Sequence, residues 1–119
     1  MESCKSNNHE KIKNKLINSP EFSEKVKEAS NIFSLLGDES RMRILLALCE
    51  GELCVYHICE ITGGKQSATS QHLRKLKDNN IVKSRKEANQ VLYSLADEHI
   101  KEIIEICMIH LECDYKSDF

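Results

Sequence analysis

The sequence predicts a mainly α-helical domain with one small β-hairpin, arranged as a winged helix-turn-helix. Apolar residues recur at helical spacing along most of the chain, and a turn containing Gly63 and Gly64 separates two short helices. Two strand-like segments follow directly, and this order is typical of a winged helix. With four Gly and one Pro in 119 residues, the chain has too few turn formers for an all-β or low-complexity protein.

We expect one domain over residues 21–113, preceded by a polar tail over 1–20 and followed by a C-terminal tail over 114–119. Residues 11–18 of the first tail form a predicted short helix, whereas the residues before them lack periodicity. A longer helix over 21–36 is predicted because apolar residues alternate at spacings of four and three. These residues are Phe22, Val26, Ala29, Phe33 and Leu36.

The boundary between this helix and the next is marked by Gly37 and Asp38. Gly37 is expected to end the first helix as a C′ glycine, and Asp38 to cap a helix that runs to about Cys49. Gly51 then breaks the helical pattern. The second helix places three apolar residues toward the core, namely Ile44, Leu45 and Leu48.

The helix-turn-helix is predicted over the next segment. A short apolar helix spans 53–61, a tight turn spans 62–64, and a polar helix spans 66–78 with Leu73 and Leu76 inward.

The period then changes from helical to alternating. Residues 81–85 and 90–95 are predicted to form two strands around a connection at 86–89. A last helix is predicted over 97–113. Its apolar stripe consists of Ile100, Ile103, Ile104, Cys107 and Leu111.

The charge is unevenly distributed. The formal net charge is −2, yet residues 65–86 carry seven basic side chains and one acid, whereas 97–119 carry seven acids and two lysines. A basic stretch within a nearly neutral protein suits an anionic partner that approaches from one side, such as double-stranded DNA.

The polar helix over 66–78 is the predicted recognition helix. The residues at its N-terminal end are small or able to form hydrogen bonds, so they can approach base edges in the major groove. They are Gln66, Ser67, Ala68, Thr69, Ser70, Gln71 and His72. Basic residues further along the helix and on the hairpin are expected to contact phosphates. They are Arg74, Lys75, Lys77, Lys83, Arg85 and Lys86.

Four runs of sequence resemble the ArsR/SmtB family of metal- and metalloid-responsive winged-helix repressors. They are LGDESRMRIL from residue 36, GELCV from 51, QSATSQHLRKL from 66 and YSLADEH from 93. The similarity covers about residues 22–113, and the combination is far more specific than any single run. The resemblance implies a homodimer formed through the first and last helices. It also implies that metal binding weakens binding to an inverted-repeat operator.

The last helix carries a candidate metal site made of Asp97, His99, His110 and Cys113. His99 and His110 are eleven residues apart, which is three turns, so they share a face but lie about 16 Å apart along the axis. Two antiparallel helices of a dimer solve this by pairing opposite ends. The spacing matches the family's interfacial site, where Cys113 replaces the usual His or Glu. The thiol favours zinc or cadmium, although Glu112 or water remain alternatives for the fourth ligand.

A second candidate site surrounds the short helix over 53–61. In the resemblance, Cys54 occupies a ligand position, but Tyr56 stands where cadmium and arsenic sensors have a second cysteine. Cys59 matches a third arsenic-ligand position, so a two-thiol site and an arsenic-responsive repressor remain an alternative. His57 stands where some zinc sensors have an aspartate. The N-terminal tail can contribute two further ligands, Cys4 and His9.

The remaining cysteines, Cys49 and Cys107, fall on apolar stripes, where a free thiol commonly packs as a small hydrophobe. The alternative is a dithiol that senses persulfide or oxidants, as in some family members. The sequence contains no Cys-x-x-Cys, nucleophile elbow or phosphate-binding loop, which argues against an enzyme. It also contains no apolar run long enough for a membrane span or a secretion signal, so we expect a cytoplasmic protein.

Overall fold

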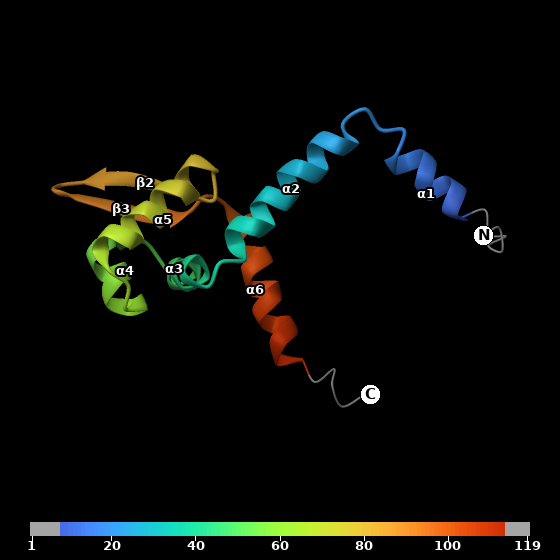
Figure 1. The fold of residues 1–119 in the computed structure, drawn as a ribbon. Coiled ribbons are helices and arrows are strands. Elements are labelled where there is room, and N and C mark those ends of the chain that lie inside the picture. The colour runs from blue at the N-terminus through green and yellow to red at the C-terminus, as the bar shows by residue number, and fades with distance from the viewer. Residues whose placement is uncertain (1–7, 114–119) are drawn as a thin grey trace. The chain divides into compact units, whose positions relative to one another are not determined.

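A computed structural model describes residues 8–113 and contains, within that range, six helices and three strands (Figure 1). In chain order they are α1 (Asn8–Leu16), α2 (Phe22–Leu36), α3 (Glu39–Cys49), β1 (Leu53–Cys54), α4 (Val55–Thr62), α5 (Gln66–Asp78), β2 (Val82–Glu87), β3 (Gln90–Leu95) and α6 (Glu98–Glu112). The chain separates between Ser34 and Leu35 into two compact units.

The first unit holds α1 and most of α2. Helix α1 starts at Asn8, three residues before the predicted start, and none of its side chains is buried. Helix α2 matches the prediction within one residue. Its apolar stripe is largely exposed, with Val26 47% and Phe33 62% accessible.

The passage from α2 to α3 differs from the prediction at Gly37. Helix α2 ends at Leu36 as expected, but the glycines with a positive φ are Gly51 and Gly63, so Gly37 does not act as a left-handed cap. The reason is that α3 begins almost at once. The Arg41 side chain reaches back and donates from Nε to the Leu35 carbonyl over 2.9 Å, which satisfies an end carbonyl of α2.

Asp38 caps α3 as predicted. Its carboxylate accepts a hydrogen bond of 3.0 Å from the Arg41 backbone N–H, and this bond lowers the pKa of Asp38.

The core of the second unit lies between α3, α4, α5, the sheet and the first half of α6. The predicted inward residues of α3 and α5 are all buried. The buried apolar set is Leu35, Leu36, Ile44, Leu45, Leu48, Ile58, Leu73, Leu76, Ile81, Val82, Leu95, Ile100 and Ile104.

The predicted helix over 53–61 begins two residues late, because Leu53 and Cys54 form strand β1. They pair antiparallel with Tyr93 and Leu92 of β3. A short apolar run does not reveal this, since the pairing partner is distant in sequence. Helix α4 ends as predicted at Gly63, whose φ of 78° is left-handed and whose N–H donates to the Cys59 carbonyl over 2.8 Å.

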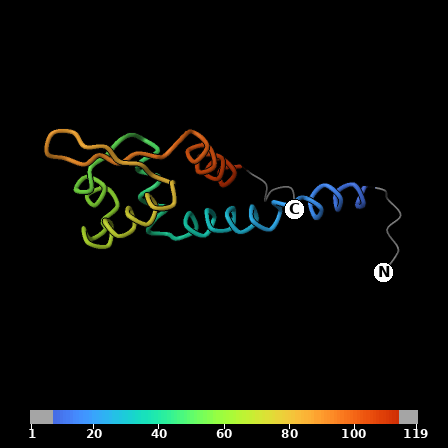
Figure 2. The backbone as a smooth tube through the Cα atoms, turned by 90° about the horizontal axis from the view of Figure 1, so that it is seen from above, coloured from blue at the N-terminus to red at the C-terminus, as the bar shows by residue number. Residues whose placement is uncertain are grey.

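The strands form one antiparallel sheet in the order β1-β3-β2. Strand β2 continues to Glu87, so the hairpin turn consists of Ala88 and Asn89 rather than the four predicted residues. The additional pairs are Lys86 with Val91 and Glu87 with Gln90. The hairpin, or wing, extends beyond α4 and α5 in both backbone views (Figures 1 and 2).

Helix α6 is buried only over its first half. Ile100 and Ile104 pack into the core, but Cys107 is exposed and Leu111 is 70% accessible. The expectation that Cys107 is a buried hydrophobe is therefore wrong for the single chain, because the C-terminal half of α6 runs past the body that covers its first turns (Figure 1). Cys49 on α3 is half-buried. Within residues 8–113, no helix combines the length and apolar character needed to cross a membrane.

The turn between α4 and α5 gives a test of the fold. Gly63→Ala places a side chain at φ 78° with no atom within 4 Å, so backbone strain is its main cost. We expect a loss of about 1 kcal/mol, or about 4–8 °C in the thermal midpoint. Gly63→Asn is the matched control and should lose less, because Asn tolerates the left-handed region. Equal midpoints for the Ala variant and the wild type would contradict this role.

Candidate functional site

Helix α5 has one buried side and one exposed polar side. Thr69, Leu73 and Leu76 lie at spacings of four and three and are buried. The exposed side carries most of the predicted DNA-contacting residues of this helix. They are Gln66, Ser67, Ser70, Gln71, Arg74, Lys75 and Lys77. This side can therefore offer hydrogen-bonding groups near the helix start and cations toward its end.

Thr69 was predicted to approach base edges, and the structure corrects this prediction. Thr69 is 2% accessible and cannot reach a base edge. A Cβ on Gly64 would lie 2.9 Å from the Thr69 Oγ1, so this side chain packs tightly beneath the turn. His72 is half-buried and lines a small hollow of about 80 Å³ together with Ser40 and Arg43. Thr69 holds the helix in place rather than presenting a polar group.

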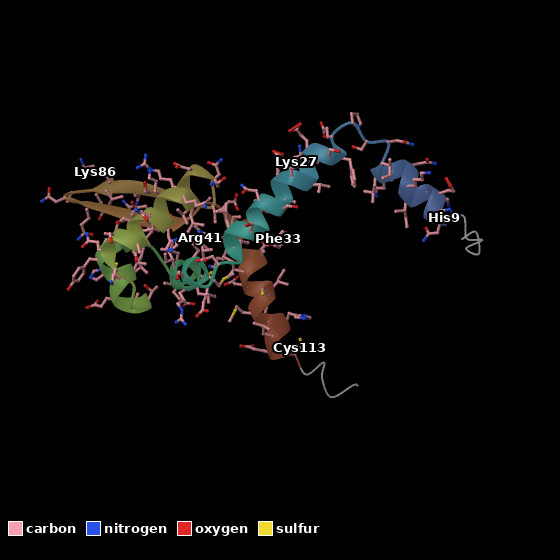
Figure 3. All side chains as sticks on the ribbon, viewed as in Figure 1. His9, Lys27, Phe33, Arg41, Lys86 and Cys113 are labelled. Carbon is pink, nitrogen blue, oxygen red and sulfur yellow. The ribbon has the colours of Figure 1, made fainter. Side chains whose placement is uncertain are left out.

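The three wing cations differ in their surroundings. Lys83 and Lys86 are exposed, and Figure 3 places Lys86 on the extended hairpin. Arg85 forms a two-pronged ion pair with Glu52, from Nε to Oε2 over 2.7 Å and from Nη2 to Oε1 over 2.8 Å. It also pairs with Glu87. These bonds lower the pKa of Glu52 and raise that of Arg85. Arg85, which the sequence predicts to contact phosphate, is thus held by two carboxylates.

The predicted metal ligands of α6 divide between its two ends. Asp97 caps the helix by accepting from the Ile100 N–H over 3.0 Å, and its Oδ1 lies 3.8 Å from the Nδ1 of His99. The His99 side chain is 88% accessible. His110 and Cys113 are exposed at the other end, where Figure 3 labels Cys113. Within residues 8–113 of one chain, no three His, Cys, Asp or Glu side chains are placed to hold a metal ion.

Of the second candidate metal site, the structure brings two residues close together, Cys54 and His57. The Sγ of Cys54 lies 3.4 Å from the Nδ1 of His57. Both residues border a groove of about 510 Å³ that α5 and β3 also line, through Ser70 and Tyr93 among others. Cys59 is half-buried on α4. Cys4 lies outside the described residues, and His9 belongs to α1 in the first unit.

The proposed Cys49–Cys107 pair is not formed within one chain. Cys49 borders a hollow whose α6 lining is Glu105, Met108, Ile109 and Glu112, and burial raises the pKa of its thiol. These lining residues share one side of α6. Cys107 lies two residues beyond Glu105, about 200° around the helix, and so faces elsewhere.

Comparisons with known proteins agree with this architecture. Residues 38–84 match the sequence pattern of the family described as "Bacterial regulatory protein, arsR family". The chain is 40% identical over 84 residues to a cadmium resistance transcriptional regulatory protein CadC homolog of Staphylococcus aureus, covering 70% of this chain and 69% of that one.

A second relative is the transcriptional repressor SmtB homolog of Synechocystis sp., which is 35% identical over 89 residues, covering 75% of this chain and 67% of the relative. The chain belongs to the arsR family. Its fold also matches a homodimeric winged helix-turn-helix DNA-binding domain from Mycobacterium bovis, with a TM-score of 0.74, 23% identity and coverage of 79% and 87% of the two chains.

As an arsR-family protein, the chain is a DNA-binding transcription regulator. Helices α4 and α5 form the helix-turn-helix, α5 is the recognition helix, and β2 and β3 form the wing. The sequence alone missed the Glu52–Arg85 pair, because the two residues are 33 positions apart and no local pattern joins them. The sequence did contain a sign that Thr69 is buried, namely its spacing of four and seven from Leu73 and Leu76.

The two ends of the exposed α5 face should contribute differently to DNA binding. Arg74→Gln should weaken binding to all sequences alike and reduce the slope of log K against log salt by about one for each recognition helix bound. Gln71→Ala should instead change the sequence preference. An operator duplex is first recovered by binding-site selection and labelled. Fluorescence anisotropy over a salt series then measures the salt slope, and comparison with other duplexes measures the sequence preference. Equal loss of salt dependence in both variants would contradict the division.

Proposed function

We propose that this protein is a metal-sensing transcriptional repressor that works as a homodimer and releases operator DNA when it binds a divalent metal, with zinc or cadmium as the effector. The names of the two relatives, a cadmium resistance regulator and a repressor, support this class of function. The observation that carries the proposal is that four side chains of types that can ligate a metal lie at the two ends of α6.

The placement on α6 requires a second chain. Asp97 and His99 lie at the start of the helix, and His110 and Cys113 at its end. The face between the histidines continues through Ile103 and Ile106, and Ile106 is 62% accessible. An apolar, uncovered stripe of this kind favours a second copy packed against it. Two antiparallel α6 helices then pair the start of each with the end of the other and complete two equivalent sites.

The donor set fits zinc or cadmium. Two imidazoles, one carboxylate and one thiolate are ligands that these ions accept, and the thiolate disfavours hard ions such as magnesium. The Oδ1 of Asp97 already accepts from the Ile100 N–H, but a carboxylate has a second oxygen that can bind a metal. A metal ion held there would link the two α6 helices of the dimer. Such a link would restrict how the two recognition helices are placed.

The expected operator is an inverted repeat. A two-fold dimer presents two identical recognition helices, and these fit half-sites that are one helical turn of DNA apart. A coupling free energy of about 1–3 kcal/mol between metal and DNA would weaken DNA binding about 5- to 150-fold.

A second sensing site is favoured by the Cys54–His57 distance. The 3.4 Å between Sγ and Nδ1 is close to the separation of about 3.5 Å that two ligands of a tetrahedral zinc ion have, given bonds of about 2.3 and 2.0 Å. Cys59, and Cys4 and His9 from the N-terminal tail, are the candidates to complete this set. A site at α4 would adjoin the recognition helix directly.

Metal titration separates the two sites. The reduced protein bound to a labelled operator duplex is titrated with zinc and with cadmium, and anisotropy reports the release of DNA. We expect release from the wild type and from Cys54→Ser/His57→Ala, but not from His99→Ala/His110→Ala. The two double variants serve as controls for each other, because each removes two ligands from one site and leaves the other intact.

The opposite pattern would move the sensor to Cys54 and His57 and contradict the role of α6. If neither metal releases DNA from the wild type, metal sensing itself is wrong. In that case, release by persulfide or oxidant that is lost in Cys49→Ser or Cys107→Ser would establish a thiol-responsive repressor instead.

A further inference from the structure

The two faces of the wing have different neighbours in the fold. Residues paired across β2 and β3 share a face because side chains alternate along a strand. One face contains the pairs Val82–Leu95, Ser84–Tyr93 and Lys86–Val91. The other contains the pairs Lys83–Ser94, Arg85–Leu92 and Glu87–Gln90.

The face with Lys86 is continuous with the helices. Val82 and Leu95 at its base are buried in the core. Further out, Tyr93 and Val91 line the groove that Ser70 of the recognition helix also lines. A duplex seated on the exposed side of α5 therefore adjoins this face of the wing. Lys86 is the cation that this face presents at its outer end.

The face with Arg85 adjoins an acidic region. A hollow beside it is lined by Lys83 and Lys101 together with four carboxylates. These are Glu50, Glu52, Asp97 and Glu98. Carboxylates and phosphates are both negatively charged and repel each other. The acidic hollow therefore disfavours the close approach of a DNA backbone to this face. The two faces of the wing are thus electrostatically distinct, although both belong to the basic stretch of the sequence.

The Arg85 side chain is held by an arrangement stronger than an ordinary surface ion pair. Exposed ion pairs usually contribute little, but two-pronged Arg–carboxylate bonds and networks of three charges are the exceptions. Glu52 directly precedes β1, and Arg85 lies on β2, the opposite edge strand of the sheet. The pair therefore spans the sheet and ties the segment after α3 to the wing.

We propose that Arg85 is a positioning residue that fixes the wing through Glu52 and Glu87, and that Lys86 is the wing's phosphate contact. The sequence alone assigned Lys83, Arg85 and Lys86 the same role. The alternation of the strand and the two carboxylates on Arg85 separate them. Glu52, an acid, then supports DNA binding by keeping the wing in place.

Whether Glu52→Gln weakens or strengthens DNA binding decides whether Arg85 positions the wing or contacts phosphate. If Arg85 positions the wing, both Glu52→Gln and Arg85→Gln weaken DNA binding, by about two- to fivefold, and leave the salt slope unchanged. Lys86→Gln lowers that slope by about one for each wing bound. The measurement is anisotropy of the metal-free protein on a labelled mixed-sequence duplex over a salt series, so its outcome does not depend on metal sensing.

Two further variants make the test specific. Glu50→Gln removes an acid of the same hollow, whereas the ion-pair partners of Arg85 are Glu52 and Glu87, and should leave binding equal or slightly tighter. The charge swap Glu52→Arg/Arg85→Glu restores an ion pair across the sheet, and should recover most of the affinity lost in either single variant. Recovery cannot occur if phosphate needs the cation at position 85.

The opposite results would overturn the proposal. Tighter binding by Glu52→Gln would mean that Glu52 withholds Arg85 from DNA. A lower salt slope in Arg85→Gln, or an unchanged slope in Lys86→Gln, would assign the phosphate contact to Arg85. Thermal midpoints of all variants identify any loss of binding that comes from unfolding. If a single variant is unfolded, the affinity of the charge-swap variant tests the proposal instead.

Discussion

The orientation of α5 about its own axis determines which of its side chains face the core and which face solvent. Leu73 and Leu76 are completely buried and Thr69 nearly so, and these three residues form one stripe. With this stripe fixed against the core, the opposite side of the helix is fixed toward solvent. Gly64 takes part in the same constraint, because a side chain there would collide with Thr69. The turn and the recognition helix are therefore a single packed unit, and the polar face follows from it.

The sequence predicted what local periodicity and capping control. The helices, the Asp38 and Asp97 caps and the break at Gly63 are decided within a few residues of chain, so they could be predicted. Features that depend on distant partners could not. Strand β1 exists because β3 accepts it, and the Leu35 carbonyl is satisfied by Arg41 rather than by a turn at Gly37. The assignment of Thr69 to DNA failed for another reason, since its polar side chain concealed an inward position that the helical spacing indicates.

Helix α6 shows why a correct apolar pattern does not by itself predict burial. Its stripe continues from Ile100 to Leu111, but the body of the single chain covers only the first two turns. The uncovered half and the separated candidate metal ligands both fit the proposed dimer, in which a second α6 would complete them. A site that is incomplete in one chain binds its ion only when the two chains are correctly placed. Such a site is suited to report on, and to fix, the geometry of a dimer.

A basic run in the sequence need not form a basic surface in the fold, and the wing is an example. Three cations within four residues suggest one basic surface. A strand, however, sends alternate residues to opposite faces, and here one face meets the recognition-helix groove while the other meets carboxylates. Arg85 with Glu52 and Glu87 forms a cluster with a net negative charge, so it adds nothing to the attraction for phosphate. Its contribution to DNA binding must come from geometry, and the acid that neutralises it becomes part of the DNA-binding structure.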